Sequence, residues 1–336
     1  MTETEQLDVP HVEVTIPVGE GPSAVALTPD GTRAYVTNYG RWATHSPGDT
    51  VSVIDTATHE VVATVKVGVG PTALEVVPDG SRVYVVNYGS GKEPGHTVSV
   101  IDTATHEVVA TVEVGNSPDG VAVTPDGRRV YISELGSEAN PGNTMSVIDT
   151  ATFEVVGTVD VGAAPGAVAI HEDGVHAYVV NYGKPTETEG TVSVIDIATN
   201  TVVTTVTVGR SPGAVAITPD GAHAYVADHG PFGDPGNTVS VIDTRTHEVA
   251  SVITVGPGPG GVAISPDGTR AYVVNMGGNT APGRTMSVID TATRTVVNTV
   301  AVERTPAGIA VSADGRRAYI ANYGANLVSV VDLTRV

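Results

Sequence analysis

The sequence predicts an all-β fold, a seven-bladed β-propeller in which each blade is a sheet of four antiparallel strands. A tyrosine-centred motif recurs seven times along the 336 residues, at Tyr35, Tyr84, Tyr131, Tyr178, Tyr225, Tyr272 and Tyr319. The step between copies is 47 residues from the second copy onward and 49 for the first. Each copy contains four short Val-rich runs separated by turn residues. A repeat of this length and content is typical of propeller blades.

The second copy shows the expected order of strands within a blade. We predict strand a at 71–77, strand b at 82–87, strand c at 97–102 and strand d at 106–114. A Pro-Asp-Gly turn joins strands a and b, because Pro presets φ and Gly tolerates the positive φ that follows. A Gly-rich loop at 89–96 is predicted between strands b and c. An Asp-Thr-Ala-Thr turn, in which the Asp can cap its own backbone, joins strands c and d.

The two ends of the chain predict that the ring closes on itself. The last copy ends near Asp332, after its strand c, and lacks a strand d of its own. The segment 11–18, HVEVTIPV, matches strand d and precedes the first strand a. We therefore expect 11–18 to complete the seventh blade, which removes two exposed sheet edges. This gives one domain at 11–336 and a disordered N-terminal tail at 1–10.

The motifs V-G-x-x-P, P-D-G, Y-V-x-N-Y-G and V-S-V-I-D-T-A-T cover 11–332 and resemble the YVTN-repeat family of seven-bladed, WD40-like propellers. That resemblance implies little about activity, because surface-layer modules, lactonase-like enzymes and redox-enzyme propellers share the build. The Gly-Pro loops also resemble virginiamycin B lyase-type propellers, but no catalytic His of that type maps onto a strand a here. We expect no haem, flavin, quinone or nicotinamide, since their ligand sets, domains or fingerprints are missing from the sequence.

The composition limits the classes of partner. The chain has 37 acidic and 17 basic residues, a formal charge of −20. Such a surface repels nucleic acid and anionic membranes, so we expect neither as a partner. There is no cysteine, which excludes disulfides and thiol chemistry. The N-terminus lacks the basic and apolar regions of a signal peptide, so we expect a cytoplasmic, monomeric protein.

Candidate site residues are found at positions facing the channel where one copy of the repeat has a different residue type from the others. Strand a carries Glu75 where the other six copies have Ala, and Asp119 where they have Ser, Thr, Gly or Ala. Strand b ends in Glu134 where most copies have Asn. Because strand a lines a propeller channel, we expect these three carboxylates to converge near its top. They would suit Ca²⁺ or Mg²⁺, a cationic substrate, or an acid–base pair with one raised pKa.

Blade five and the loops at the rim supply further candidates. Asp228 replaces the same Asn, and His229 beside it is suited to proton transfer near neutral pH, although neighbours on a strand point to opposite sides. His59, His106 and His247 recur after the c–d turn, which favours a structural role for them. The candidates for substrate binding are two aromatic and three basic residues: Trp42, Phe232, Arg41, Arg210 and Arg304.

Two functions of different class follow from these observations. The first is a non-redox enzyme of hydrolase, lyase or isomerase type that acts on a small polar molecule in the channel. Its catalytic residues would be Glu75, Glu134, Asp228 and His229, and its cation ligands Glu75, Asp119 and Glu134. The alternative is a non-catalytic scaffold that binds a protein or peptide on its rim. Close similarity among blades favours the scaffold, whereas departures gathered on one face favour the enzyme.

Overall fold

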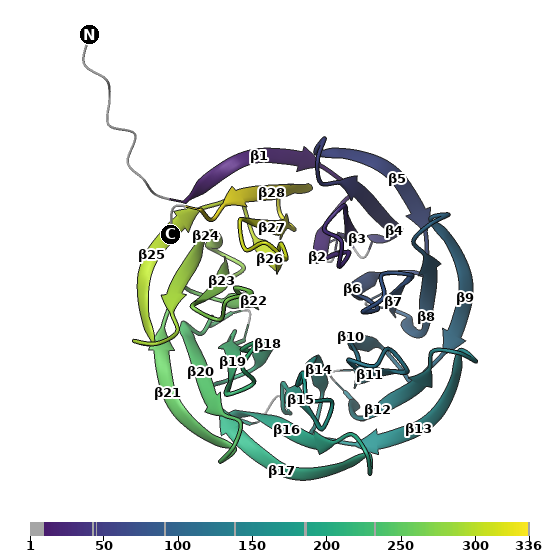
Figure 1. Ribbon diagram of the computed structural model, residues 1–336. Helices are drawn as coiled ribbons and strands as arrows, with labels where there is room; N and C mark the ends of the chain where they lie inside the picture. Colours follow the sequence, from purple (N-terminus) through teal and green to yellow (C-terminus); the bar gives the residue numbers. More distant parts are fainter. Residues whose placement is uncertain are drawn as a thin grey trace.

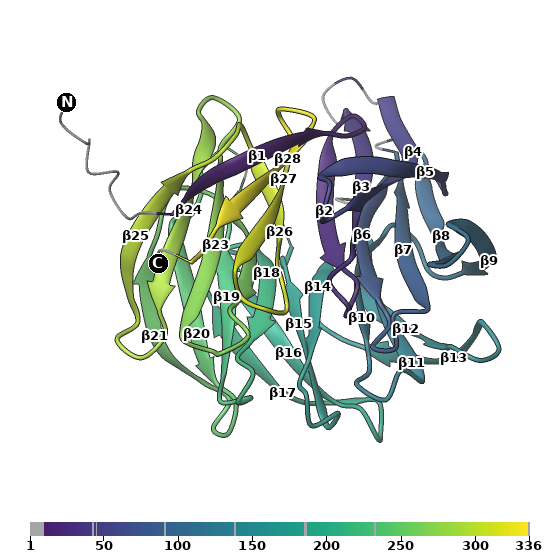
Figure 2. The ribbon, with the colours of Figure 1, turned by 45° about the horizontal axis from the view of Figure 1, so that its top comes forward.

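The computed structural model describes residues 10–41, 44, 46–90, 92–137, 139–184, 187–231 and 233–334. These residues form seven four-stranded sheets arranged as a ring around a central opening (Figure 1). The ring is thick, and the innermost strands run along its axis (Figure 2). The predicted seven-bladed propeller with four antiparallel strands per blade is confirmed.

The strands follow the predicted order in every blade. Blades one to three comprise β2 (Pro22–Leu27), β3 (Arg33–Arg41), β4 (Ser46–Asp55), β5 (Glu60–Lys66); β6 (Pro71–Val76), β7 (Arg82–Gly89), β8 (Pro94–Asp102), β9 (Glu107–Glu113); and β10 (Pro118–Val123), β11 (Arg129–Gly136), β12 (Pro141–Asp149), β13 (Glu154–Asp160). Blades four and five comprise β14 (Pro165–Ile170), β15 (His176–Asn181), β16 (Gly190–Asp196), β17 (Thr201–Val208); and β18 (Pro212–Ile217), β19 (His223–Asp228), β20 (Thr238–Asp243), β21 (Glu248–Thr254). Blades six and seven comprise β22 (Pro259–Ile264), β23 (Arg270–Gly277), β24 (Pro282–Asp290), β25 (Thr295–Ala301); and β26 (Pro306–Val311), β27 (Arg317–Asn322), β28 (Leu327–Asp332), β1 (His11–Pro17).

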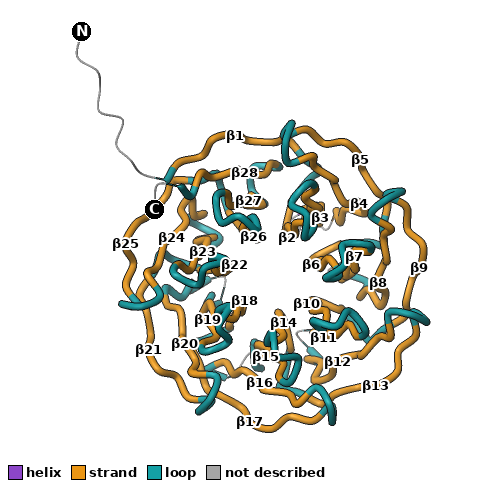
Figure 3. The backbone as a smooth tube through the Cα atoms, viewed as in Figure 1, coloured by secondary structure: helices purple, strands orange, loops and turns teal. Residues whose placement is uncertain are grey.

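The N-terminal strand closes the ring as predicted. The seventh sheet has the order β1-β28-β27-β26, and β1 pairs antiparallel with β28 from His11↔Asp332 to Pro17↔Leu327. The first and last parts of the chain therefore share one sheet. In the tube view β1 takes the outer position that β5, β9 and the other fourth strands take in their blades (Figure 3).

The hairpin between strands b and c is longer than predicted. In blade two, β7 extends to Gly89 and β8 begins at Pro94, and these two residues pair. The connecting loop is therefore 90–93 rather than 89–96. The extension contains a register shift next to Tyr88, and Gly89 has φ of 94°. A Cβ at Gly89 would lie 2.1 Å from the Gly95 nitrogen, so only glycine fits this bulge.

The core lies between the blades. Valines of β7 and β8 pack against those of β10 and β11, and equivalent clusters fill the other blade interfaces. The motif tyrosines are buried here, and several bond to the c–d turn of the next blade. The Tyr35 hydroxyl lies 3.0 Å from His106 Nδ1, and the Tyr178 hydroxyl lies 3.3 Å from His247 Nδ1. Two of the recurrent histidines, His106 and His247, therefore act as structural links between blades.

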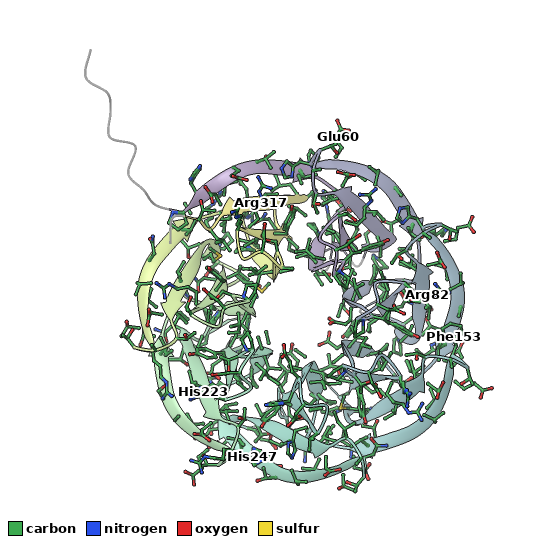
Figure 4. The ribbon with its side chains drawn as sticks, in the orientation of Figure 1. Glu60, Arg82, Phe153, His223, His247 and Arg317 are labelled. Carbon is green, nitrogen blue, oxygen red and sulfur yellow. The ribbon has the colours of Figure 1, made fainter. Side chains whose placement is uncertain are left out.

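One of these links is broken. Phe153 takes the position of His106 in the third blade, and the buried hydroxyl of Tyr84 has no hydrogen-bond partner among the described residues. Phe153 and His247 both lie toward the outside of the ring, away from the central opening (Figure 4). No helix formed by the described ranges is long and apolar enough to cross a membrane.

Candidate functional site in the central channel

The central channel is lined by the first strand of each blade, namely β2, β6, β10, β14, β18, β22 and β26 (Figure 1). These seven strands carry two charged residues, Glu75 and Asp119, and both are acidic. They lie on adjacent blades and are partly exposed, whereas Leu74 and Val76 beside Glu75 are buried. Any charge on the channel wall formed by these strands is therefore negative.

Asp119 is the second residue of β10, at a position where blades one and two place a hydroxyl group that donates a hydrogen bond. The Ser23 hydroxyl donates to the Thr72 carbonyl of the next blade at 2.9 Å, and the Thr72 hydroxyl donates to the Asp119 carbonyl at 3.4 Å. An ionised carboxylate cannot donate in this way. No described residue donates a hydrogen bond to the Asp119 carboxylate. The surrounding protein raises the pKa of Asp119 to about 6 by desolvation.

Tyrosine side chains border Asp119 at the same end of the channel. A Cβ at Gly166 would lie 2.5 Å from Tyr182 Cε2 and 3.3 Å from Asp119 Oδ2, so the ring and the carboxylate flank one glycine. Tyr39 and Tyr88 are in tilted contact, with ring centroids 6.3 Å apart. The pKa of Tyr182 and of Tyr88 is raised, first by burial and then by the nearby Asp119 charge. Tyr182 therefore lies beside this carboxylate, and Tyr88 and Tyr39 lie near enough for its charge to raise their pKa.

These tyrosines belong to a set of seven equivalent positions, one per blade, that follow the Asn at the end of strand b. We call this set the mouth ring: Tyr39, Tyr88, Leu135, Tyr182, His229, Met276 and Tyr323. A Cβ at Gly260 would lie 2.4 Å from Met276 Sδ, as for Tyr182 over Gly166. Members of the mouth ring thus cover the beginning of their own strand a. Of these positions, only His229 was predicted from the sequence to belong to the site.

Glu75 lies deeper in the channel than Asp119. It is the fifth residue of β6, whereas Asp119 is the second residue of β10. Its carboxylate has no hydrogen bond or ion pair with any residue that the structure describes. Burial is the single cause that raises its pKa, to about 7. Because this pKa lies near neutral pH, small changes around Glu75 decide whether its carboxyl group is neutral or charged.

Glu134 lies inside blade three and not in the channel. Its carboxylate accepts hydrogen bonds from the Gly115 backbone nitrogen at 2.9 Å and from the hydroxyls of Thr144 and Ser146. The Asn residues of other blades use the same slot, where Asn87 donates to Thr97 and Ser99. Glu134 is 7% exposed and fully engaged by its own blade. The expected convergence of Glu75, Asp119 and Glu134 is therefore wrong.

The predicted set of three cation ligands has no geometric support. Within the described ranges, no three His, Cys, Asp or Glu side chains are arranged to hold a metal ion. The reason is the alternation of strand b, which turns Glu134 into the blade while its neighbour Leu135 takes the channel side. Glu75 and Asp119, without Glu134, are therefore the acidic candidates for a site in the channel.

Asp228 and His229 do not form a catalytic dyad. Asp228 fills the Asn slot of blade five and accepts from Gly209, Thr238 and Ser240 at 2.8–3.0 Å. Burial outweighs these bonds and raises its pKa to about 6. His229 turns the other way into the mouth ring, where its Nδ1 donates to the Gly230 carbonyl at 2.6 Å. Burial lowers the pKa of His229, so its ring is neutral at pH 7.

The predicted rim residues are spread around the top of the ring. Arg41 pairs with Glu20, and Arg210 pairs with Asp234 at 2.8 Å, both on the exposed surface. Exposed ion pairs of this kind contribute little stability. Arg304 is exposed next to Gly324. Trp42 and Phe232 lie outside the described residues.

Comparisons with known proteins agree with the fold. The profile of the Choice-of-anchor I domain matches residues 144–336, more than half of the chain, and that of the YNCE-like beta-propeller matches 16–129. A solved structure of hydrazine synthase from Kuenenia stuttgartiensis is 24% identical, with a TM-score of 0.81, and the match covers all of both chains. At this identity the likeness shows the fold alone. A search of curated proteins gave no match.

Proposed function

The chain belongs to the Choice-of-anchor I domain family, and we propose that its propeller binds a small organic cation, an amine, at the mouth of the central channel. Asp119 would be the counter-ion of the bound ammonium group. Tyr39, Tyr88 and Tyr182 would form the aromatic wall around it. The observation that carries this proposal is a partly exposed acidic side chain beside Tyr182 and near Tyr88 and Tyr39, to which no described residue donates a hydrogen bond.

The chemistry of this arrangement favours a cation over other ligands. An ammonium group would donate to the Asp119 carboxylate, which lacks a donor from the protein. The faces of tyrosine rings attract cations, and the attraction is larger where water is excluded. No lysine or arginine lies on the seven innermost strands, so an anionic ligand would meet only repulsion there.

Calorimetric titration with hexylamine and hexanol tests the proposal, because the two probes share a chain and differ in charge. We expect hexylamine to bind and hexanol to bind at least tenfold more weakly. Asp119→Asn should weaken hexylamine binding at least tenfold and leave the melting temperature equal to or above that of the wild type, because it removes a carboxylate whose pKa the fold raises. Glu107→Gln, on the exposed outer strand β9, is the matched control and should bind like the wild type. Equal binding of both probes, or no effect of Asp119→Asn, would refute the proposal.

A second candidate is acid–base catalysis at the same site, in an enzyme of hydrolase, lyase or isomerase type. It is favoured by the raised pKa values of Asp119, about 6, and Glu75, about 7, because general acids and bases work best near the ambient pH. Turnover of amine esters or lactones, with kcat/KM changing through these pKa values and lost in Glu75→Gln, would support it. A rate independent of pH between about 5 and about 8 would exclude it.

A further inference from the structure

A second carboxylate shares the channel with Asp119 and has no role in binding a single ammonium group. Glu75 is on β6, the strand next to β10, and the other six blades have alanine in its position. Its equivalent on β10 is Ala122, which is buried. Glu75 is partly exposed, and its carboxylate is unpaired within the described part of the chain. The protein supplies nothing that offsets its charge.

The two carboxylates lie at different depths. Both strands start with a proline at the mouth, and Glu75 is three positions further along its strand than Asp119 is along the next. At a rise of about 3.3 Å per residue, their backbone positions differ by about 10 Å along the strands. One ammonium group cannot bridge that separation, whereas two ammonium groups on one chain can.

The wall between the two levels is small and apolar. The residue after the Asp119 position in each blade is alanine or glycine: Ala24, Ala73, Gly120, Ala167, Ala214, Gly261 and Gly308. The next position is valine, leucine or isoleucine throughout, and the side chains of Val25, Leu74, Val121 and Val215 are buried in the cores between the blades. Neither level carries a polar side chain, and the polar groups left there are backbone groups on the free edge of each first strand.

We propose that the channel selects a linear aliphatic diamine, with one ammonium group on Asp119 at the mouth and the other on Glu75 below. The inference rests on the proposed function and specifies its ligand class. The tyrosines of the mouth ring enclose the outer ammonium group. The alanine and glycine levels hold the methylene chain, and Glu75 acts as the specificity-determining residue for the second charge.

The test compares hexamethylenediamine with hexylamine by calorimetric titration of the full chain. We expect the diamine to bind at least tenfold more tightly than the monoamine to the wild type. In Glu75→Gln this advantage should vanish, so that the two amines bind with similar affinity. In Asp119→Asn both amines should bind at least tenfold more weakly. Thermal unfolding of each variant verifies that it is folded.

The outcomes separate the two proposals. If hexylamine binds through Asp119 but the diamine gains nothing, the diamine inference is overturned and the amine-binding function stands. If the diamine advantage persists in Glu75→Gln and is unchanged in the Glu107→Gln control, another group holds the second ammonium and the inference is overturned. If neither amine binds the folded wild type, both proposals fail.

Discussion

Glu134 and Glu75 depart from the repeat in the same way, because each places a glutamate where most blades carry an uncharged residue. Their surroundings differ. Glu134 lies within a blade, where a backbone nitrogen and two hydroxyls donate to its carboxylate. Glu75 lies on the channel wall, where no described residue donates to it and burial raises its pKa to about 7. The same substitution is thus a structural variation in one region and an unmatched charge in the other.

The largest effect that tests this comparison is on stability. Glu134→Ala leaves three donors in blade three without their acceptor, and each buried unpaired group costs about 1–3 kcal/mol. We therefore expect a loss of about 3 kcal/mol or more in the free energy of unfolding. Glu134→Gln, which keeps an acceptor oxygen, should lose about 1 kcal/mol or less. Urea denaturation at pH 7 measures both.

The matched change in the channel is Glu75→Ala, which restores the residue of the other six blades. It removes a carboxylate that the fold does not stabilise, so the variant should be as stable as the wild type or more stable. A loss as large as that of Glu134→Ala would show that Glu75 has a structural partner and would break the comparison.

A smaller effect on stability concerns Asp228. Its carboxylate accepts three hydrogen bonds, yet burial still destabilises its charged form. Its pKa is raised to about 6 in the fold, above its ordinary value, so the folded state favours the protonated form. The contribution of Asp228 to stability should fall as the pH rises from about 4 to about 6, and the fall should be complete above that range. Asp228→Asn removes this contribution because Asn carries no charge, and Asn is the residue of five other blades.

We expect Asp228→Asn to match the wild type at about pH 3.5 and to exceed its unfolding free energy by about 2–3 kcal/mol at about pH 7.5. Urea denaturation at the two pH values provides the measurement. A gain of equal size at both values would mean that charge burial is not the cause.

The sequence predicted the ring, the blade order and the closing strand because these depend on period and on alternation within short segments. It placed Glu75 and Asp119 on the channel wall for the same reason. It failed for Glu134, whose partners Gly115 and Thr144 are 19 and 10 residues away and meet it only in the folded blade. It also did not group Tyr88 and Tyr182 with Asp119. The alternation of side chains along strand b could have placed these tyrosines, because the residue next to an Asn that points into the blade must face the channel.

The smallest effect tests a contact between blades. Phe153 occupies the position where His106 bonds to Tyr35 in another blade, and the buried Tyr84 hydroxyl is left unpaired. Phe153→His should give that hydroxyl a partner and stabilise the protein by about 1 kcal/mol. The double variant Phe153→His, Tyr84→Phe is the control and should lose the gain. Thermal unfolding of the two variants decides between these results.

The most direct measurement is an NMR titration of the side-chain carboxyl carbons of Asp119 and Glu75, with and without hexylamine. The account predicts midpoints near the pKa values of about 6 for Asp119 and about 7 for Glu75 in the free protein. It also predicts that hexylamine lowers the midpoint of Asp119, because a bound cation stabilises the carboxylate. Midpoints near about 4 for both residues, or an Asp119 midpoint that hexylamine leaves unchanged, would contradict it.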